Sequence, residues 1–195
     1  MSAPRYWAVV PAAGVGRRMG ASIPKQYLKL AGRPIIERTL QTLSSHCRIA
    51  GVMIALSEDD EWWRDGCVVD VIRCRGGSQR CHSVLNALHE LLDGPAAEND
   101  WALVHDAVRP LLRERDIDRL IDEVGTDVDG GLLGLPVRDT MKRTDADDRI
   151  KETVSRERLW HALTPQLFPI ESLIGALARS LDKDVLVTDE AQAME

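Results

Sequence analysis

The sequence lacks any apolar run near the roughly 20 residues that a membrane-spanning helix needs. Its first residues, MSAPRYWAVV, also lack the charged segment and the long apolar segment of a secretory signal peptide. Neither a low-complexity tract nor an internal repeat is present, which argues against a disordered chain and against a solenoid. The composition, with 44% hydrophobic and 29% charged residues, is ordinary for a globular protein. We therefore expect one cytoplasmic domain with no membrane partner.

Cysteine is scarce, and its spacing fits no common metal site. The four cysteines, Cys47, Cys67, Cys74 and Cys81, include no C-x-x-C pair. The even spacing of the last three, with His82 beside them, invites a metal interpretation, but zinc ligands usually lie closer together in sequence. Reduced thiols are normal in the cytosol, so we expect ordinary structural cysteines.

An excess of positive charge is also missing. The net charge of −6 argues against a nucleic-acid-binding protein, which usually carries a basic face. Positive charge gathers instead near one glycine-rich segment, at Arg17, Arg18, Lys25, Lys29 and Arg33. An acidic protein with one basic, glycine-rich loop indicates a small polyanionic ligand.

Short apolar runs alternate with segments of helical spacing along the chain. Buried strands are predicted over 6–13 and 130–137, further strands over 51–57 and 68–74, and a short apolar strand over 101–105. Helices are predicted over 35–43, 80–93, 116–124 and 171–181. For the third helix we expect Asp116 to be the cap and Gly125 to end it. The alternation predicts an open, mostly parallel α/β sheet with helices on both faces.

Residues 138–156 depart from this alternation. They hold two polar, β-leaning runs around a TDADD turn, with little apolar surface to bury. This pattern predicts a protruding hairpin, and an isolated hairpin is marginally stable on its own. Packing against a second subunit would explain it, and an ordinary edge hairpin on the same domain is the alternative.

The basic loop lies in the stretch PAAGVGRRMGASIPKQY, directly after the first predicted strand. A dinucleotide fingerprint needs G-x-G-x-x-G with an acidic residue about 20 positions on, and here the third glycine comes one residue late. The P-loop pattern is absent as well. Gly14 and Gly16 would let backbone N–H groups approach phosphate oxygens, and Arg18 and Lys25 would neutralise a triphosphate. A glycine turn with solvated surface charges is the alternative.

A second candidate site is the stretch LVHDAVRP, where a predicted strand ends. Ligands of open α/β sheets bind beyond the carboxyl ends of the strands. Asp106 stands at such an end, where a carboxylate can hold Mg²⁺ together with substrate phosphates. Arg109 lies three residues on and can contact another phosphate. Asp is also a common turn residue, which is the alternative reading of Asp106.

Taken together, these stretches resemble one enzyme family. PAAGVGRRMGASIPKQY, GGSQRCHSV, LVHDAVRP, PVRDTMKR, WHALTPQ and TDEAQAME occur in the order seen in the 2-C-methyl-D-erythritol 4-phosphate cytidylyltransferases, from about Trp7 to Glu195. The first motif is shared with many nucleotidyltransferases, whereas the joint set is specific. The resemblance implies a Rossmann-like sheet of the nucleotide-diphospho-sugar transferase type, forming a single nucleotidyltransferase domain over residues 1–195.

The resemblance also implies a reaction and the residues that perform it. CMP would pass from CTP to 2-C-methyl-D-erythritol 4-phosphate in isoprenoid precursor synthesis, with Mg²⁺ on Asp106 and with Arg18 and Lys25 as catalytic residues. The CTP-binding residues that it implies are Ala12, Ala13, Gly14, Gly16, Arg18, Lys25, Gly77, Ser78, Arg80 and Ser83. The residues that it implies for the polyol phosphate are Arg109, Thr140, Arg156 and Thr164.

Further expectations follow from the family. The 138–156 hairpin resembles an arm that embraces a second subunit, which implies a homodimer. Ser78 stands where some members have an acidic residue, so base recognition there would rely on backbone groups. The family continues beyond the TDEA motif to a strand with an Asp and a Lys that help to bind metal and substrate, and the sequence ends at Glu195 without them.

The histidines are not expected to act as catalytic bases. A phosphate nucleophile is already anionic near neutral pH, so the proposed reaction requires no general base. We expect His46, His89 and His105 to be structural or surface residues, and His161 is the one candidate for the lining of the site.

Three other functions compete with this one. Another polyol-phosphate cytidylyltransferase, such as one that uses ribitol 5-phosphate, shares part of the motifs, although DTMKR and WHALTPQ favour methylerythritol phosphate. A nucleotide-binding protein that has lost its activity together with the C-terminal segment is the second. A dinucleotide-dependent oxidoreductase is disfavoured by the glycine spacing.

Overall fold

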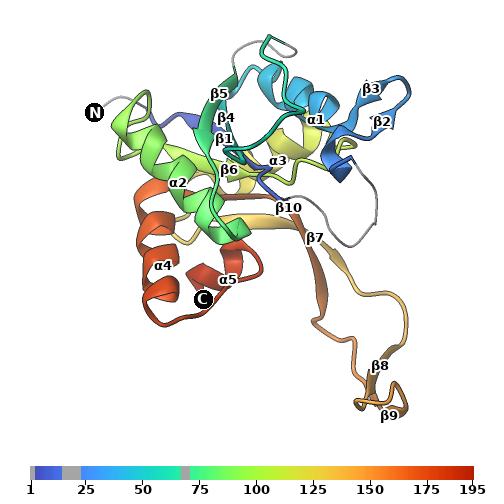
Figure 1. Cartoon of the computed structure of the whole chain (residues 1–195). Helices are drawn as coiled ribbons and strands as arrows, with labels where there is room; N and C mark the ends of the chain where they lie inside the picture. Colours follow the sequence, from blue (N-terminus) through green and yellow to red (C-terminus); the bar gives the residue numbers. More distant parts are fainter. Residues whose placement is uncertain (1–2, 15–22, 67–70) are drawn as a thin grey trace.

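A computed structural model describes residues 3–14, 23–66 and 71–195 (Figure 1). Within these ranges one six-stranded sheet forms the centre of the molecule, in the order β5-β4-β1-β6-β10-β7. Its strands are β1 (Tyr6–Pro11), β4 (Ile49–Leu56), β5 (Val71–Arg75), β6 (Trp101–Val104), β7 (Gly131–Pro136) and β10 (Trp160–Pro169). Neighbours from β5 to β6 run parallel, and β10 runs antiparallel to both β6 and β7. The predicted open, mostly parallel sheet is confirmed.

Helices cover both faces of this sheet. They are α1 (Ile35–Ser44), α2 (Arg80–Asp93), α3 (Glu114–Val124), α4 (Ile170–Asp182) and the short α5 (Glu190–Met194). A 3₁₀ turn, η2 (Lys25–Tyr27), and a small hairpin of β2 (Lys29–Leu30) and β3 (Arg33–Pro34) precede α1. Figure 1 shows α2 and α4 on one side of the sheet and α1 and α3 on the other. The predicted coverage of both faces is therefore confirmed.

The core divides into two layers because side chains of a strand alternate between the faces. In β1, Ala8 and Val10 pack in the cluster with α1 and α3, whereas Trp7 and Val9 pack in the cluster with α2 and α4. These strand residues are 4% exposed or less. The helical stripe Val84, Leu88 and Leu91, buried against the second cluster, holds α2 in place. The carboxyl end of β1 and the start of α2 are thus fixed relative to each other.

The start of α3 differs from the sequence-based prediction. Asp116 lies in the first turn of α3 and is not its cap; the helix begins at Glu114, and the capping position holds Arg113. Asp116 still favours the helix because its carboxylate lies near the positive end of the helix dipole. Gly125 ends α3 as predicted, and its N–H donates to the Ile121 carbonyl.

The segment 130–137 forms a strand, but the prediction that it is buried is wrong. β7 is half-buried to exposed, with Leu135 56% exposed, because it lies at the edge of the sheet. Its inner neighbour is β10, a strand that the sequence did not predict. The outer half of β10, from Trp160, is exposed, so it has no continuous apolar run.

The predicted hairpin is confirmed as the strands β8 (Met141–Thr144) and β9 (Ile150–Val154), which pair antiparallel. It extends away from the sheet beyond β7 and β10 (Figure 1). Lys142 donates to the Thr153 hydroxyl at 2.6 Å, and the Asp145 carboxylate accepts two backbone N–H groups in the turn. Ile150 remains 66% exposed. Local polar contacts thus hold the hairpin, whose apolar side chains have little to pack against.

Across the described ranges, the helices are all too short or too polar to cross a membrane.

Candidate active site

A cavity of about 630 Å³ opens at the carboxyl ends of β1 and β6, where ligands of open α/β sheets bind. Its walls are the turn after β1, the turn before α2, the turn after β6, the middle of β10 and the segment before α5. The predicted residues that line it are Ala12, Ala13, Gly14, Lys25, Gly77, Ser78, Arg80, Ser83, Asp106, Arg109 and Thr164. The sheet therefore brings together motifs that lie far apart in the sequence.

Two described residues among those predicted, Thr140 and Arg156, are not part of this lining, and two others cannot be placed. Gly16 and Arg18 lie outside the described residues. Thr140 precedes β8 and Arg156 follows β9, so both lie in the hairpin and not among the residues around the cavity. His161, the histidine expected in the lining, is also not part of it; Ala162 is the nearest residue of β10 that lines the cavity.

Gln26 joins the two described ends of the basic loop. It is 3% exposed, and its side-chain amide donates to the Ala12 carbonyl at 2.9 Å and to the Gly14 carbonyl at 3.2 Å. The Ala12 N–H in turn donates to Ala55 of β4 at 2.8 Å, which extends the sheet pairing past β1. These bonds hold η2 against the turn after β1, so that Lys25 lies at the wall of the cavity.

The turn before α2 is built by Ser83. Its hydroxyl accepts from the Gly77 N–H at 3.0 Å and donates to the Gln79 carbonyl at 3.1 Å. A Cβ atom on Gly76 would overlap Ala13, so glycine lets this turn approach the turn after β1. Ser83 therefore shapes the wall of the cavity by holding its backbone.

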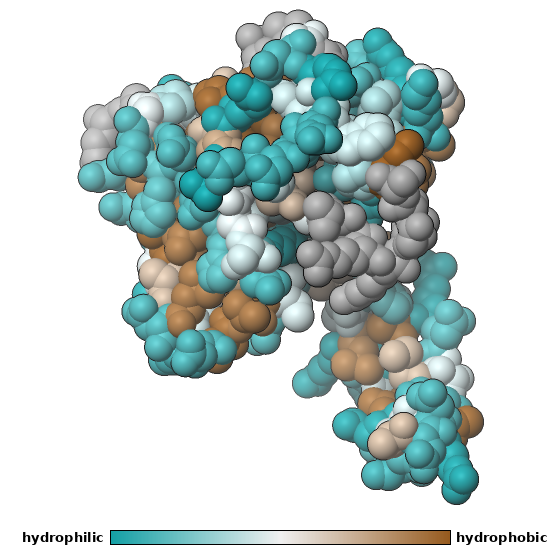
Figure 2. All heavy atoms as spheres, viewed as in Figure 1, coloured by the Kyte–Doolittle hydropathy of each residue, from teal (hydrophilic) through white to brown (hydrophobic). Residues whose placement is uncertain are grey.

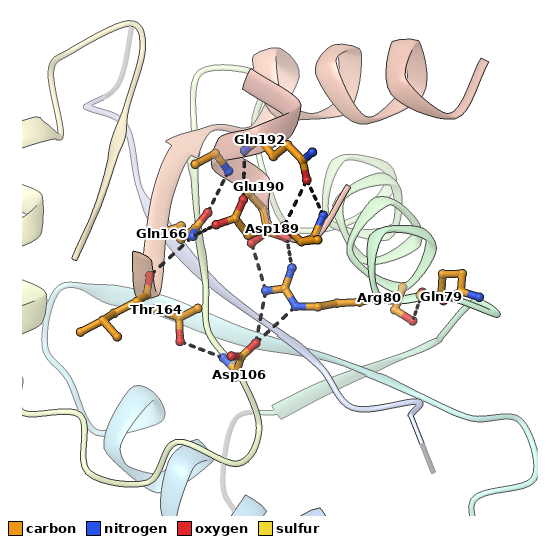
Figure 3. Close-up of polar contacts among 12 residues, drawn as sticks. Gln79, Arg80, Asp106, Thr164, Gln166, Asp189, Glu190 and Gln192 are labelled. Carbon is orange, nitrogen blue, oxygen red and sulfur yellow. Dashed lines mark hydrogen bonds and ion pairs between the residues drawn. The ribbon is translucent and has the colours of Figure 1, made fainter. Parts of the chain in front are cut away.

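Asp106 contacts two guanidinium groups, that of Arg80 (Figure 3) and that of Arg109. Arg109 Nε donates to its Oδ2 at 2.9 Å, and Arg80 reaches its Oδ1 at 3.3 Å. Burial disfavours the charged carboxylate, but the charges of Arg80 and Arg109 outweigh burial and hold the pKa of Asp106 below its usual value. The carboxylate is therefore ionised at neutral pH.

Arg80 is also paired with a second carboxylate, that of Glu190 at the start of α5. Arg80 Nη1 and Nη2 face Glu190 Oε1 and Oε2, and the second of these contacts is 3.0 Å long. The Glu190 side chain is 1% exposed. Burial raises the pKa of Glu190, and the charge of Arg80 opposes that rise. Arg80 thus connects α2, the turn after β6 and α5 (Figure 3).

Thr164 of β10 is oriented by His105. His105 Nε2 lies 3.0 Å from the Arg109 carbonyl, which can only accept, so Nε2 carries the proton. Its Nδ1 therefore accepts the Thr164 hydroxyl at 3.0 Å. Burial lowers the pKa of His105, which keeps the imidazole neutral and preserves this pattern. His105 is structural, as expected, and it fixes the side chain of one predicted binding residue.

Several residues of this site were not among the predicted ones. Gln166 is 1% exposed, donates to Asp189 at 3.0 Å and accepts the Ala191 N–H at 2.9 Å. Asp189 caps α5 by accepting the Gln192 N–H at 3.0 Å (Figure 3). Other unpredicted lining residues are Pro11, Gln26, Gln79, Ala107, Val108, Ala162 and Thr188. Most lie within the quoted motifs, but uncharged or buried side chains carry no sign of their partners in the sequence.

The donor set fits a cation that arrives with phosphates and not a metal held by protein ligands alone. Among the described residues, no group of three or more His, Cys, Asp or Glu side chains could hold a metal ion. Asp106 offers one ionised carboxylate at the cavity, whose lining also includes Asp189. Mg²⁺ commonly takes one or two carboxylates and completes its shell with phosphate oxygens and water. Asp106 is therefore suited to a nucleotide-bound Mg²⁺.

Comparison with known sequences points to one family. The family model described as 2-C-methyl-D-erythritol 4-phosphate cytidylyltransferase matches residues 6–195. The protein of that name from Pseudomonas aeruginosa PAO1 is 50% identical over 195 residues, which cover 98% of this chain and 83% of the relative. The one from Pseudomonas putida GB-1 is 48% identical with the same coverage.

Solved structures agree. The crystal structure of a 4-diphosphocytidyl-2C-methyl-D-erythritol synthase matches with a TM-score of 0.86 and 34% identity, covering 100% of this chain and 85% of that one. The 2-C-methyl-D-erythritol 4-phosphate cytidylyltransferase of Francisella tularensis matches with a TM-score of 0.82 and 29% identity, covering 97% and 85%. The chain is a cytidylyltransferase and belongs to the 2-C-methyl-D-erythritol 4-phosphate cytidylyltransferase family.

Proposed function

We propose that the enzyme transfers CMP from CTP to 2-C-methyl-D-erythritol 4-phosphate, a step in isoprenoid precursor synthesis. A phosphate oxygen of the polyol attacks the α-phosphorus of CTP in line, and the bond from that phosphorus to the β-phosphate oxygen breaks. The products are 4-diphosphocytidyl-2-C-methyl-D-erythritol and pyrophosphate. The observation that carries the proposal is the gathering of Lys25, Arg80, Asp106 and Arg109 around one cavity at the carboxyl ends of β1 and β6.

Catalysis would depend on positioning and on charge neutralisation, because an anionic phosphate nucleophile needs no general base. We propose that Lys25 and Arg18 neutralise the negative charge that develops around the α-phosphate. In support, Lys25 and Gly14 both line the cavity, and Gln26, the neighbour of Lys25, donates to the Gly14 carbonyl. The role of Arg18 rests on its motif, because this residue lies outside the described ranges.

We assign the metal site to Asp106. Mg²⁺ bound there would neutralise phosphate charge and hold the phosphate oxygens in place. The ionised state of Asp106 supports this role, as does its place beside Arg109, whose guanidinium can reach a phosphate from the same turn.

We assign the turn before α2 to cytosine. Gly77 and Ser78 line the cavity opposite Ala13, and the close approach of the two turns favours a pyrimidine over a larger purine. Ser78 carries no charge, so the amino group of the base would be read by backbone carbonyls. Ser83 acts by holding this turn.

Arg109 and Thr164 are the candidates for the polyol phosphate within one chain, because both line the cavity near Asp106. Thr140 and Arg156 lie in the hairpin, outside that lining. If they bind the same substrate, they must come from another copy of the chain. We therefore propose a homodimer in which the 138–156 arm of each subunit reaches the cavity of its partner.

Apolar side chains at the base of the arm support this assembly. Leu135 is 56% exposed, Leu159 is 39% exposed and Trp160 is 63% exposed. Figure 2 shows apolar surface where the arm leaves the sheet, next to a largely hydrophilic tip. Exposed apolar patches commonly mark protein interfaces, and a second copy of the chain would cover this one.

Pyrophosphate release with CTP and Mg²⁺ tests the proposed function. We expect turnover with 2-C-methyl-D-erythritol 4-phosphate and little with ribitol 5-phosphate. Faster turnover with ribitol 5-phosphate would assign the enzyme to another acceptor. Binding of CTP in calorimetry without turnover on either acceptor would indicate a nucleotide-binding protein without this activity.

A further inference from the structure

Arg80 is shared between two carboxylates that come from distant parts of the chain. Asp106 follows β6, and Glu190 is the first residue of α5. Figure 3 shows the guanidinium between them, with Glu190 on one side and Asp106 on the other. The side chains of Arg80 and Asp106 are partly exposed to the cavity, whereas that of Glu190 is 1% exposed. The buried carboxylate therefore has Arg80 as its ion-pair partner and faces away from solvent.

The sharing is unequal. Both terminal nitrogens of Arg80 bond Glu190, one to each carboxylate oxygen. Asp106 receives longer contacts, because Arg80 Nε and Nη2 both lie 3.3 Å from the single oxygen Oδ1. Arg109 holds the other oxygen, Oδ2, at 2.9 Å. Oδ1 is therefore the more weakly bound oxygen of Asp106.

An arginine beside a metal-binding carboxylate needs a counter-charge. The guanidinium cannot lose its proton, so its charge persists at any pH the enzyme meets. A divalent cation near Asp106 would be repelled by that charge, and a closed bidentate pair with Arg80 would occupy the oxygens that the cation needs. The carboxylate of Glu190, on the side of Arg80 away from Asp106, reduces both the repulsion of the cation and the hold of Arg80 on the Asp106 oxygens.

We propose that Glu190 is a positioning residue that keeps Asp106 open to a divalent cation by drawing the Arg80 guanidinium towards α5. This inference rests on the proposed function, which makes Asp106 the metal ligand. Helix α5 has other attachments, because Gln166 bonds the Ala191 N–H and Asp189 caps the helix. The buried charge of Glu190 is thus not required merely to fasten α5, and a buried ion pair is seldom the most stable way to fill such a place.

Binding of Mn²⁺ to the enzyme in the presence of CTP tests this, measured by the loss of the electron paramagnetic resonance signal of free hexaaqua-Mn²⁺ beyond the loss that CTP alone causes. We expect Glu190→Gln to weaken Mn²⁺ binding about tenfold, because the charge of Arg80 is then unbalanced beside Asp106. In the double variant Arg80→Gln, Glu190→Gln the excess charge is gone, and we expect affinity within about threefold of the wild type. Gln192→Ala is the matched control, since Gln192 bonds Thr188 in the same turn without contacting Arg80.

The outcomes separate this inference from the function on which it rests. Equal losses in the single and double variants would show that Glu190 has only a structural role and would overturn the inference. The same holds if Asp106→Asn abolishes Mn²⁺ binding while Glu190→Gln leaves it unchanged. If Asp106→Asn has no effect, the metal assignment itself is wrong, and the inference fails with it.

A crystal structure of the wild type with CTP and Mg²⁺ gives a readout that does not depend on a variant folding. We expect Arg80 to keep both contacts with Glu190 while Asp106 Oδ1 turns from Arg80 to the metal. A metal-bound structure in which Arg80 has left Glu190 for Asp106 would contradict the inference.

Discussion

Lys25 and Gln26 are neighbours on η2 with different tasks. The Gln26 amide is buried and donates to two backbone carbonyls, those of Ala12 and Gly14, at the start of the basic loop. The Lys25 ammonium is exposed at the cavity wall, where solvent or a phosphate can reach it. The buried residue therefore sets the position of the charged one, which leaves Lys25 free to interact with the ligand.

Replacement of Lys25 by alanine is expected to lower kcat about a hundredfold and to change the affinity for CTP much less. The reason is that its charge would matter most when negative charge develops on the departing pyrophosphate. Single-turnover rates and CTP binding by calorimetry measure the two effects separately. Lys29→Ala, an exposed lysine in β2 outside the cavity lining, is the matched control. Equal losses in rate and affinity would make Lys25 a binding residue only.

The cationic and acidic residues of the site could be predicted, because charge next to glycine or at a strand end is visible in the sequence. Lys25, Asp106 and Arg109 all line the cavity as expected. Glu190 and Gln166 could not be predicted, because their importance comes from burial and from partners across the fold. Glu190 is separated from Arg80 by 110 residues, and nothing in the TDEA motif indicates that Arg80 is its partner.

At the level of elements, the turn before α2 shows how a helix start shapes a ligand site. Ser83 lies in the first turn of α2, and its hydroxyl bonds backward to both Gly77 and Gln79. The helix is itself fixed by the apolar stripe that packs on the sheet. The turn is consequently fastened to a helix that packs on the core, although its own residues are small and polar.

Ser83→Ala is expected to raise the KM for CTP about tenfold and to leave the KM for the polyol phosphate nearly unchanged. It removes two hydrogen bonds that hold the turn assigned to cytosine, each worth about 0.5–1.5 kcal/mol. Steady-state kinetics with each substrate varied in turn gives the comparison. Ser180→Ala in α4 removes a similar helical serine bond far from the cavity and serves as the control. A parallel rise in both KM values would mean that the turn does not act specifically on the nucleotide.

Strands of the central sheet with a continuous apolar run could be predicted, whereas β10, which lacks one, could not. β1, β4 and β6 are buried on both faces, so their sequences are apolar throughout. β10 combines an exposed half with a buried half, and its pairing with β7 is irregular between Ala162 and Gln166. Neither a continuous apolar run nor a regular alternation of polar and apolar residues marks such a strand, although Thr164 of this strand lines the cavity.

At the scale of the whole molecule, a single chain explains neither what stabilises the arm nor what the arm does. Its strands are joined by exposed polar pairs such as Arg143 with Glu152, which contribute little in water. The apolar residues at its base remain exposed. Both observations are accounted for if the arm packs on a second copy, so that each active site contains residues of two subunits.

This arrangement predicts that two inactive variants restore activity when mixed. One variant carries Thr140→Ala and Arg156→Ala in the arm, and the other carries Asp106→Asn in the cavity. After the subunits exchange, half of the dimers are mixed, and each mixed dimer has one cavity and one partner arm intact, so we expect about a quarter of the wild-type activity. Asp106→Asn mixed with Lys25→Ala is the control, because both changes damage cavities and no combination leaves one whole. Recovery absent from the first mixture, with dimers and subunit exchange confirmed by sedimentation and mass spectrometry, would mean that each arm serves its own subunit or does not contact substrate.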